Sequence, residues 1–134
     1  QLGRYVQMDN RVFRAIKAAT PGPYTFILEA TREVPRVMQH PRKRTIGVRV
    51  PDHVTTLALL DRLGEPLISS TLIAPGETEP MSDGWQINEE LGHLLDGVLD
   101  SGDVPRDPTT VIDLTGDEPV IVRRGGGNPS LFEP

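Results

Sequence analysis

The chain has 134 residues, of which 37% are hydrophobic and 4% aromatic, and its formal net charge is −5. This length supports one modest globular domain or a part of one, with a core built mainly from aliphatic side chains. The absence of cysteine excludes a disulfide framework and a thiolate metal site, and no apolar run reaches the ~20 residues of a membrane-spanning helix. We therefore expect a cytoplasmic protein with no membrane partner, and leave its oligomeric state open.

The charge is divided unevenly along the chain. Residues 1–62 contain 11 Lys and Arg against 5 Asp and Glu, whereas residues 63–134 contain 3 against 14. Several of the basic residues gather between positions 32 and 49, including the run Arg42, Lys43 and Arg44. Such a patch suits phosphate groups of a nucleotide or of RNA, although a solvated basic loop is the more frequent explanation of such a run.

A first helix ends at a rigid turn. Its apolar positions, behind a cap at Asp9 or Asn10, are Val12, Phe13, Ile16 and Ala19. The segment Thr20–Leu28 then places two prolines around Gly22 and continues into a run of strand-favouring residues. This pattern predicts a stiff helix-to-strand connector that delivers a threonine hydroxyl at the start of a strand over residues 24–30.

The remaining pattern predicts a mixed α/β chain. We expect further strands at residues 45–50, 67–73 and, as a short piece, 98–99, with a closing hairpin of 110–114 and 120–123. One helix is predicted to begin at Pro51 and to end at Gly64. Another is predicted over residues 87–95, interrupted or ended near Gly92. The tail from Gly125 is expected to be irregular. Early alternation of strands and helices followed by a hairpin predicts a twisted, mixed open sheet with flanking helices.

Polar residues on or beside these apolar strands are the candidate site. Arg49 interrupts an apolar strand. Its guanidinium could bind a carboxylate or phosphate through two hydrogen bonds, or Arg49 could be an exposed residue of an edge strand. Four hydroxyl side chains lie at predicted strand ends, where open α/β sheets commonly bind ligands: Ser69, Thr71, Thr109 and Thr110. Arg123 ends the last predicted strand. There is no phosphate-binding glycine loop, dinucleotide fingerprint or zinc-ligand spacing.

Five segments in the same order and spacing resemble the YciO/YrdC family, most closely its YciO branch: residues 20–28, 45–51, 64–71, 108–114 and 119–125. The resemblance implies an α/β (α+β) fold of YrdC/RibB-like type. The best-understood members are threonylcarbamoyl-AMP synthases, which use ATP, bicarbonate and L-threonine to make the precursor of a modified adenosine in tRNA. Family members have also been linked to double-stranded RNA.

The resemblance also implies roles for individual residues. Arg49, Ser69 and Thr109 would bind the amino acid, with Arg49 on its carboxylate. Thr45, Thr71 and Arg123 would bind the ATP cofactor, with Mg²⁺ on its phosphates. Catalysis would rest on positioning and charge stabilisation rather than on a protein nucleophile.

The chain departs from the synthase pattern in two places. Ile73 stands where the synthases have an asparagine, so one polar contact near the nucleotide would be lost. The family's N-terminal part, which carries a Lys-x-Arg motif for the ATP phosphates, precedes the region that matches this chain. We therefore expect residues 1–134 to form a single domain that is incomplete at its N-terminus, binds ATP poorly and lacks activity by itself.

Three functions are compatible with these features. The first is the synthesis of a threonylcarbamoyl adenylate or a related adenylated compound. The second is a non-catalytic, translation-associated module that binds tRNA or double-stranded RNA through Arg42, Lys43 and Arg44. The third is a hydrolase of threonylcarbamoyl compounds that uses the same pocket.

Overall fold

The chain divides into two compact units, each described here by itself. The computed structural model describes residues 1–105 and 107–133. Unit 1 comprises Gln1–His53 and Pro108–Pro134, and unit 2 comprises Val54–Asp107. Unit 2 is thus inserted in the sequence between two parts of unit 1.

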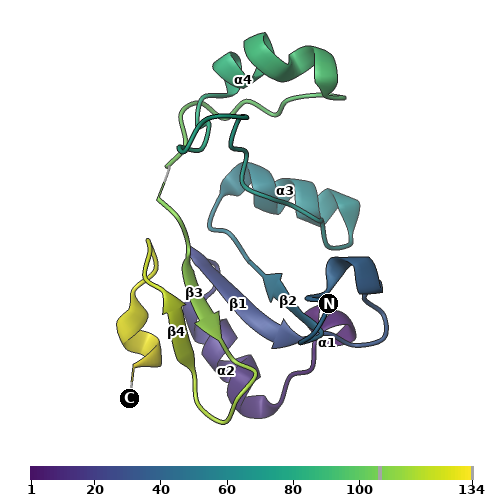
Figure 1. The fold of residues 1–134 in the computed structure, drawn as a ribbon, viewed down its shortest axis with the longest axis vertical. Helices are drawn as coiled ribbons and strands as arrows, with labels where there is room; N and C mark the ends of the chain where they lie inside the picture. Colours follow the sequence, from purple (N-terminus) through teal and green to yellow (C-terminus); the bar gives the residue numbers. More distant parts are fainter. Residues whose placement is uncertain (106, 134) are drawn as a thin grey trace. The chain divides into compact units, whose positions relative to one another are not determined.

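Unit 1 is built on a four-stranded mixed sheet (Figure 1). In the order in which they lie side by side, its strands are β2 (Thr45–Val48), β1 (Tyr24–Glu29), β3 (Thr110–Asp113) and β4 (Val120–Arg123). The central strands β1 and β3 are parallel, and both outer pairs are antiparallel. The predicted mixed sheet is therefore confirmed, although the strand expected at 45–50 ends at Val48.

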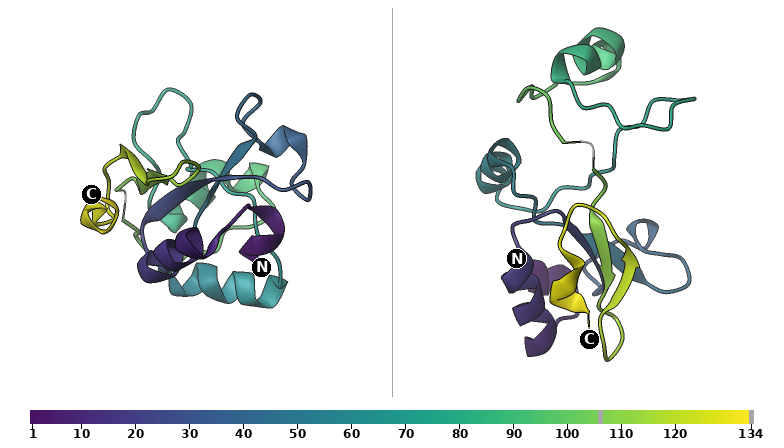
Figure 2. Two further views of the ribbon diagram at one scale, coloured as in Figure 1. Left: turned by 90° about the horizontal axis from the view of Figure 1, so that it is seen from below. Right: turned by 90° about the vertical axis from the view of Figure 1, so that its left-hand side faces the viewer.

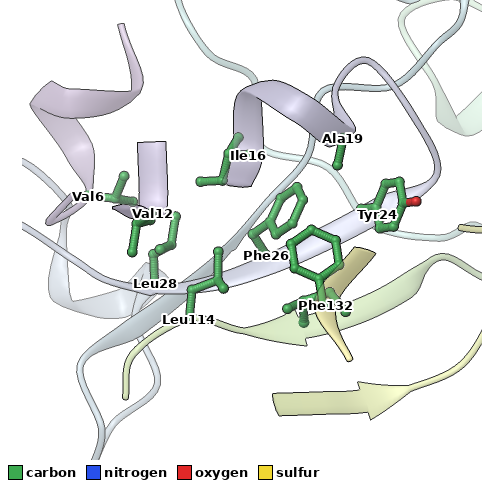
Figure 3. Packing of buried hydrophobic residues seen from close by; sticks show 10 residues of the cluster. Val6, Val12, Ile16, Ala19, Tyr24, Phe26, Leu28, Leu114 and Phe132 are labelled. Atoms are coloured by element: carbon green, nitrogen blue, oxygen red, sulfur yellow. The ribbon is translucent and has the colours of Figure 1, made fainter. Parts of the chain in front are cut away.

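Helix α2 (Asn10–Ala19) covers one face of this sheet (Figures 1 and 2). The Asp9 carboxylate accepts a hydrogen bond of 2.8 Å from the Val12 N–H, so Asp9 is the N-cap. The side chains of β1 that alternate toward the helix, Tyr24, Phe26 and Leu28, form the core with it, as Figure 3 shows. Ile112 of β3 belongs to the same buried cluster. Phe13, predicted for the same helix face, is instead 49% exposed.

Two short elements of unit 1 are not evident in the sequence pattern. Helix α1 (Leu2–Tyr5) precedes Val6, which is buried and forms an antiparallel bridge with Ala30. A single 3₁₀ turn, η1 (Arg36–Met38), lies in the basic connection between β1 and β2. Between α2 and β1, the Thr20–Pro21 peptide bond is cis, and the Thr20 hydroxyl donates to the Ile16 carbonyl at 2.8 Å.

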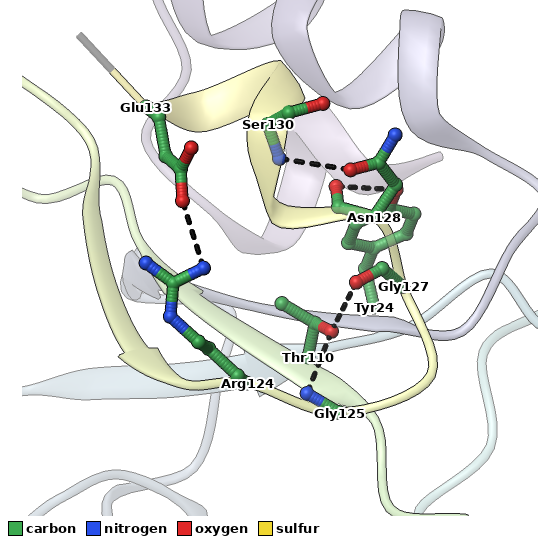
Figure 4. A network of polar contacts seen from close by, with 8 residues as sticks. All are labelled: Tyr24, Thr110, Arg124, Gly125, Gly127, Asn128, Ser130 and Glu133. Carbon is green, nitrogen blue, oxygen red and sulfur yellow. Dashed lines mark hydrogen bonds and ion pairs between the residues drawn. The ribbon is translucent and has the colours of Figure 1, made fainter.

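The C-terminal tail is ordered by the core rather than irregular. The 3₁₀ helix η3 (Pro129–Phe132) inserts Phe132 edge-on against the rings of Tyr24 and Phe26, with centroid distances of 5.8 and 5.7 Å. The buried Thr110 hydroxyl donates to the Gly127 carbonyl at 2.6 Å and accepts from the Gly125 N–H at 3.0 Å (Figure 4). The expectation of an irregular tail was wrong because a single aromatic residue near its end completes the core.

Unit 2 is helical where it is regular. Helix α3 (Val54–Leu63) ends at Gly64, which has the expected left-handed φ of +73°, and α4 (Gly84–Leu91) leads into the 3₁₀ helix η2 (Gly92–Leu94). The strands predicted at 67–73 and 98–99 are absent from this described segment. Apolar residues favour a strand, but the strand forms only where a neighbour pairs with its backbone, and no such ladder is present here. No helix in the described part of the chain combines the length and the apolar character that crossing a membrane requires.

Candidate functional site

The face of the sheet opposite α2, here called the second face, carries most of the predicted site residues. Strand alternation and the register place on it Thr25 and Ile27 of β1, Thr45 and Gly47 of β2, and the β3 residues Val111 and Asp113. These side chains are half-buried or exposed, whereas the residues between them on β1 are buried against α2. The strand pattern thus separates an apolar core from a more polar second face.

Arg123 and Thr109 meet on this face. The Arg123 Nε and Nη2 atoms donate to the Thr109 carbonyl at 3.0 and 2.9 Å, and Nη2 also donates to the Thr109 hydroxyl at 3.1 Å. In turn the Thr109 hydroxyl lies 2.7 Å from the hydroxyl of Thr25. The planar guanidinium is therefore held along one edge, and no hydrogen-bond partner for Nη1 is found among the described residues.

Gly47 lies beside Thr25 on the neighbouring strand. A Cβ at position 47 would stand 3.1 Å from Thr25 Cγ2, closer than side chains normally approach. Glycine at position 47 therefore leaves room for the methyl group of Thr25. The sequence predicts a threonine hydroxyl at the start of β1 and a small residue at position 47. It does not predict that Thr25 lies beside Arg49, because that depends on the register between β1 and β2.

Arg49 follows β2 immediately and is exposed. Val50, the next residue, lines an apolar cavity with Phe13, Ile16 and Thr20 of the α2 region. Since successive side chains of extended backbone point to opposite sides, Arg49 belongs to the second face. It stands one step beyond the pair Phe26–Val48, which places it next to Thr25.

Thr45 lies on the same face but at the other end of β2. Its register partner is Glu29, the last residue of β1. Four residue-to-residue steps along extended backbone separate Thr45 from Arg49, a distance of about 13 Å at 3.3 Å per step. A ligand that contacts both residues must therefore be long, and the part near Thr45 would face a carboxylate.

The cluster of Arg49, Thr109 and Arg123 occupies the amino ends of the parallel strands β1 and β3. At the opposite, carboxyl ends lies a cavity of about 380 Å³ whose lining includes Asp9, Glu29 and Asp117. Arg11 also lines it, but its guanidinium is bonded to the carbonyls of Gly116 and Asp117. Acidic groups predominate there, so the anion-binding potential lies at the amino ends.

The two remaining predicted site residues, Ser69 and Thr71, lie in unit 2. Both are exposed, and because the strand predicted around them is absent, they are not at a strand end. Next to Thr71 along the chain, the Leu72 carbonyl accepts a backbone hydrogen bond of 2.9 Å from the Met81 N–H. Ile73, at the position where the sequence departs from the synthase pattern, is 46% exposed.

The basic run Arg42, Lys43 and Arg44 forms a tight turn in unit 1. The His40 Nδ1 atom accepts hydrogen bonds of 3.2 Å from both the Arg42 and the Lys43 N–H, and the Arg44 N–H donates to the His40 carbonyl at 2.9 Å. Arg44 has a φ of +55°, an uncommon value for a residue with a side chain. All three cations are exposed. The turn therefore presents them to solvent on a backbone fixed by its own hydrogen bonds.

A family model and several proteins match this chain. The model Sua5_yciO_yrdC, described as "Telomere recombination", matches residues 1–125. The YciO protein of Escherichia coli is 45% identical over 132 residues, which are 98% of this chain and 64% of that protein. A threonylcarbamoyl-AMP synthase of Pyrococcus abyssi is 32% identical over 107 residues, which are 79% of this chain and 31% of the synthase.

Solved structures agree with these matches. The crystal structure of E. coli YciO superposes with a TM-score of 0.90 and covers 98% of this chain and 64% of that one. P. abyssi Sua5 in complex with L-threonine has a TM-score of 0.81 at 27% identity, covering 94% of this chain and 37% of that one. The chain thus spans about two thirds of the YciO relative and about a third of the synthase.

Proposed function

The chain belongs to the Sua5/YciO/YrdC family, and from this membership and the second face of its sheet we propose that it binds an L-threonine-type amino acid together with an adenylate. The observation that carries the proposal is the row of polar side chains formed by Arg49, Thr25, Thr109 and Arg123 at one end of the second face. A relative, P. abyssi Sua5, has been solved with L-threonine, which supports an amino acid as one ligand.

The spacing of the two arginines suits a ligand with an anionic group at each end. Arg49 continues β2 and Arg123 ends β4, so three strand-to-strand spacings, about 14 Å, separate their backbones. Guanidinium groups bind carboxylates and phosphates through paired hydrogen bonds. We assign the amino-acid carboxylate to Arg49 and the phosphate of the nucleotide to Arg123, whose Nη1 atom is available for it.

The residues present fit a nucleotide better than they fit a metal ion held by the protein. Arg123 and the nearby hydroxyls are donors for phosphate oxygens, whereas Glu29 and Asp113 lie toward the other end of the second face. Within the described ranges, no three His, Asp or Glu side chains are grouped as metal ligands. In this proposal Mg²⁺ is bound through the phosphates of ATP, where it would neutralise their charge.

The chemistry follows from positioning rather than from a reactive side chain. Formation of a threonylcarbamoyl adenylate needs the amino acid, bicarbonate and the α-phosphate to be aligned and their negative charges offset. Arg49 and Arg123 supply fixed positive charge at the two ends, and the hydroxyls between them orient the centre. Hydrolysis of a threonylcarbamoyl compound would use the same contacts, so the direction of the reaction is decided by assay.

Isothermal titration calorimetry with L-threonine tests the binding proposal on the chain itself. We expect saturable binding by the wild-type chain and its loss in Arg49→Ala, with weak binding of ATP. Pyrophosphate release in the presence of ATP, bicarbonate and L-threonine, measured in parallel for this chain and for E. coli YciO, tests synthesis. Wild-type calorimetry without any heat of L-threonine binding would refute the proposed function.

A second candidate, RNA binding, is favoured by the basic turn. Arg42, Lys43 and Arg44 are exposed on a fixed backbone and lie within a half of the chain that has a net positive charge. Binding through such cations releases counterions, so RNA affinity should fall steeply as salt rises. Gel-shift titrations of double-stranded RNA at several salt concentrations, with a triple charge reversal to Glu, test this function. Equal affinity of the wild type and the triple variant would exclude this surface as the RNA site.

A further inference from the structure

The directions of the hydrogen bonds made by Thr109 decide whether the neighbouring Thr25 hydroxyl can donate to a ligand on the second face. Arginine nitrogens only donate, so the Thr109 hydroxyl oxygen accepts from Arg123 Nη2. Thr109 is 8% exposed, and the Thr25 hydroxyl is the acceptor found for its own hydrogen among the described residues. Either hydroxyl could be the donor in this pair, but buried hydroxyl hydrogens are normally satisfied, and donation from Thr109 to Thr25 is the direction that gives the Thr109 hydrogen an acceptor.

This direction leaves the hydrogen of the Thr25 hydroxyl free to be donated away from Thr109. Thr25 is half-buried on the second face, and its Cγ2 methyl group lies toward Gly47, where an added Cβ would come within 3.1 Å of it. The chain of bonds therefore runs from Arg123 through Thr109 to Thr25, and each bond polarises the next in the same sense. Its end is a hydroxyl donor that lacks an acceptor within the described structure.

Arg49 is the charged residue that follows the neighbouring strand β2 and could share a ligand with Thr25. Arg49 comes one residue after Val48, the register partner of Phe26, so its backbone lies beside Thr25. We propose, on the basis of the function proposed above, that Thr25 donates to the carboxylate of the amino-acid ligand bound by Arg49. Thr109 and Arg123 act as positioning residues that fix the direction of this donor.

A hydrogen bond to a carboxylate contributes more than one between neutral groups, so its loss should be measurable. Thr25→Val keeps the shape of the side chain but removes the hydroxyl, and Thr25→Ser keeps the hydroxyl. We expect Thr25→Val to weaken L-threonine binding about tenfold to a hundredfold, with near wild-type affinity in Thr25→Ser. Thr115→Val is the matched control, because the Thr115 hydroxyl donates to the Asp113 carboxylate in the β3–β4 turn and has no part in the contacts of Thr25 and Thr109.

The experiment is a set of calorimetric and amide-NMR titrations of the whole chain with three probes: L-threonine, L-threoninol and acetate. Support requires that wild type and Thr115→Val bind L-threonine but not L-threoninol, which lacks the carboxylate, and that Thr25→Val loses this binding. Circular dichroism of each variant establishes that it is folded.

Other outcomes separate this inference from the proposed function. Unchanged L-threonine affinity in Thr25→Val overturns the role of Thr25 and leaves the proposed function standing. A second outcome is that L-threonine does not bind, but acetate shifts the amide NMR signals of Thr25 and Gly47 in the wild type and in Thr25→Ser and not in Thr25→Val. That result would support the carboxylate site and show that the proposed function is wrong. If none of the probes binds to the wild type, both are overturned.

Discussion

Replacing Thr110 by valine should destabilise unit 1 although it changes only one buried atom. Thr110 is fully buried, and its hydroxyl links β3 to the tail by donating to the Gly127 carbonyl and accepting from the Gly125 N–H. Valine has nearly the same shape and favours strands, so packing and strand propensity are preserved. The effect of Thr110→Val therefore reports on the two hydrogen bonds.

The magnitude follows from the groups that lose their partner. A buried donor or acceptor without a partner costs about 1–3 kcal/mol, and this substitution removes the partner of one N–H and one C=O. Gly125 is itself exposed, so water can partly satisfy its N–H, whereas Gly127 is buried. We expect the free energy of unfolding to fall by about 2–3 kcal/mol.

Urea denaturation followed by far-ultraviolet circular dichroism measures this change, with the midpoint compared at constant m-value. Thr110→Ser, which retains the hydroxyl, should lie closer to the wild type, and the exposed Thr115→Val should change stability by no more than about 0.5 kcal/mol. A Thr110→Val protein within 0.5 kcal/mol of the wild type, or a serine variant as unstable as the valine variant, would refute the reasoning.

Three further predictions concern the core and the second face. Phe132→Ala should lower the free energy of unfolding by about 3–5 kcal/mol in the same urea assay, whereas Leu131→Ala, at a 57% exposed position, should change it little. Arg123→Lys should lower it by about 1 kcal/mol, because an ammonium cannot bond the Thr109 carbonyl and hydroxyl as the guanidinium does; stability equal to wild type would argue against that contact. Gly47→Ala should leave stability within about 1 kcal/mol but weaken L-threonine binding in calorimetry, because its Cβ displaces Thr25; unchanged affinity would show that the site tolerates this crowding.

Sequence patterns predicted the elements whose signals are local. The Asp9 cap, the glycine after α3 and the alternating run of β1 each act within a few residues, and each is present in the structure. The strand expected at 67–73 failed because a strand also depends on a neighbour that its own sequence does not specify. The burial of Phe132 was not predicted, because a single aromatic residue in a polar tail forms no periodic pattern and its partners, Tyr24 and Phe26, are distant in the sequence.

The candidate site was predictable in its residue types and less so in its contacts. Arg49, Thr109 and Arg123 were chosen from the sequence, and all three lie at the same end of the sheet. The hydrogen bond between the hydroxyls of Thr25 and Thr109 joins residues 84 positions apart, so no local pattern could reveal it. The contribution of Ser69 and Thr71 stays a prediction, because they belong to the other unit.

The pairing of β1 with β3 determines how late unit 1 can complete its folding during synthesis on the ribosome. Tyr24 pairs with Thr110, so β1 leaves the ribosome long before its parallel partner exists. Until β3 and Phe132 have followed, the apolar side of β1, with Phe26 and Leu28, lacks part of its covering. Such non-local pairing makes folding slow and exposes intermediates to aggregation. The polar contacts on the second face depend on the same late pairing, so the proposed ligand-binding surface should be among the last parts of unit 1 to assemble.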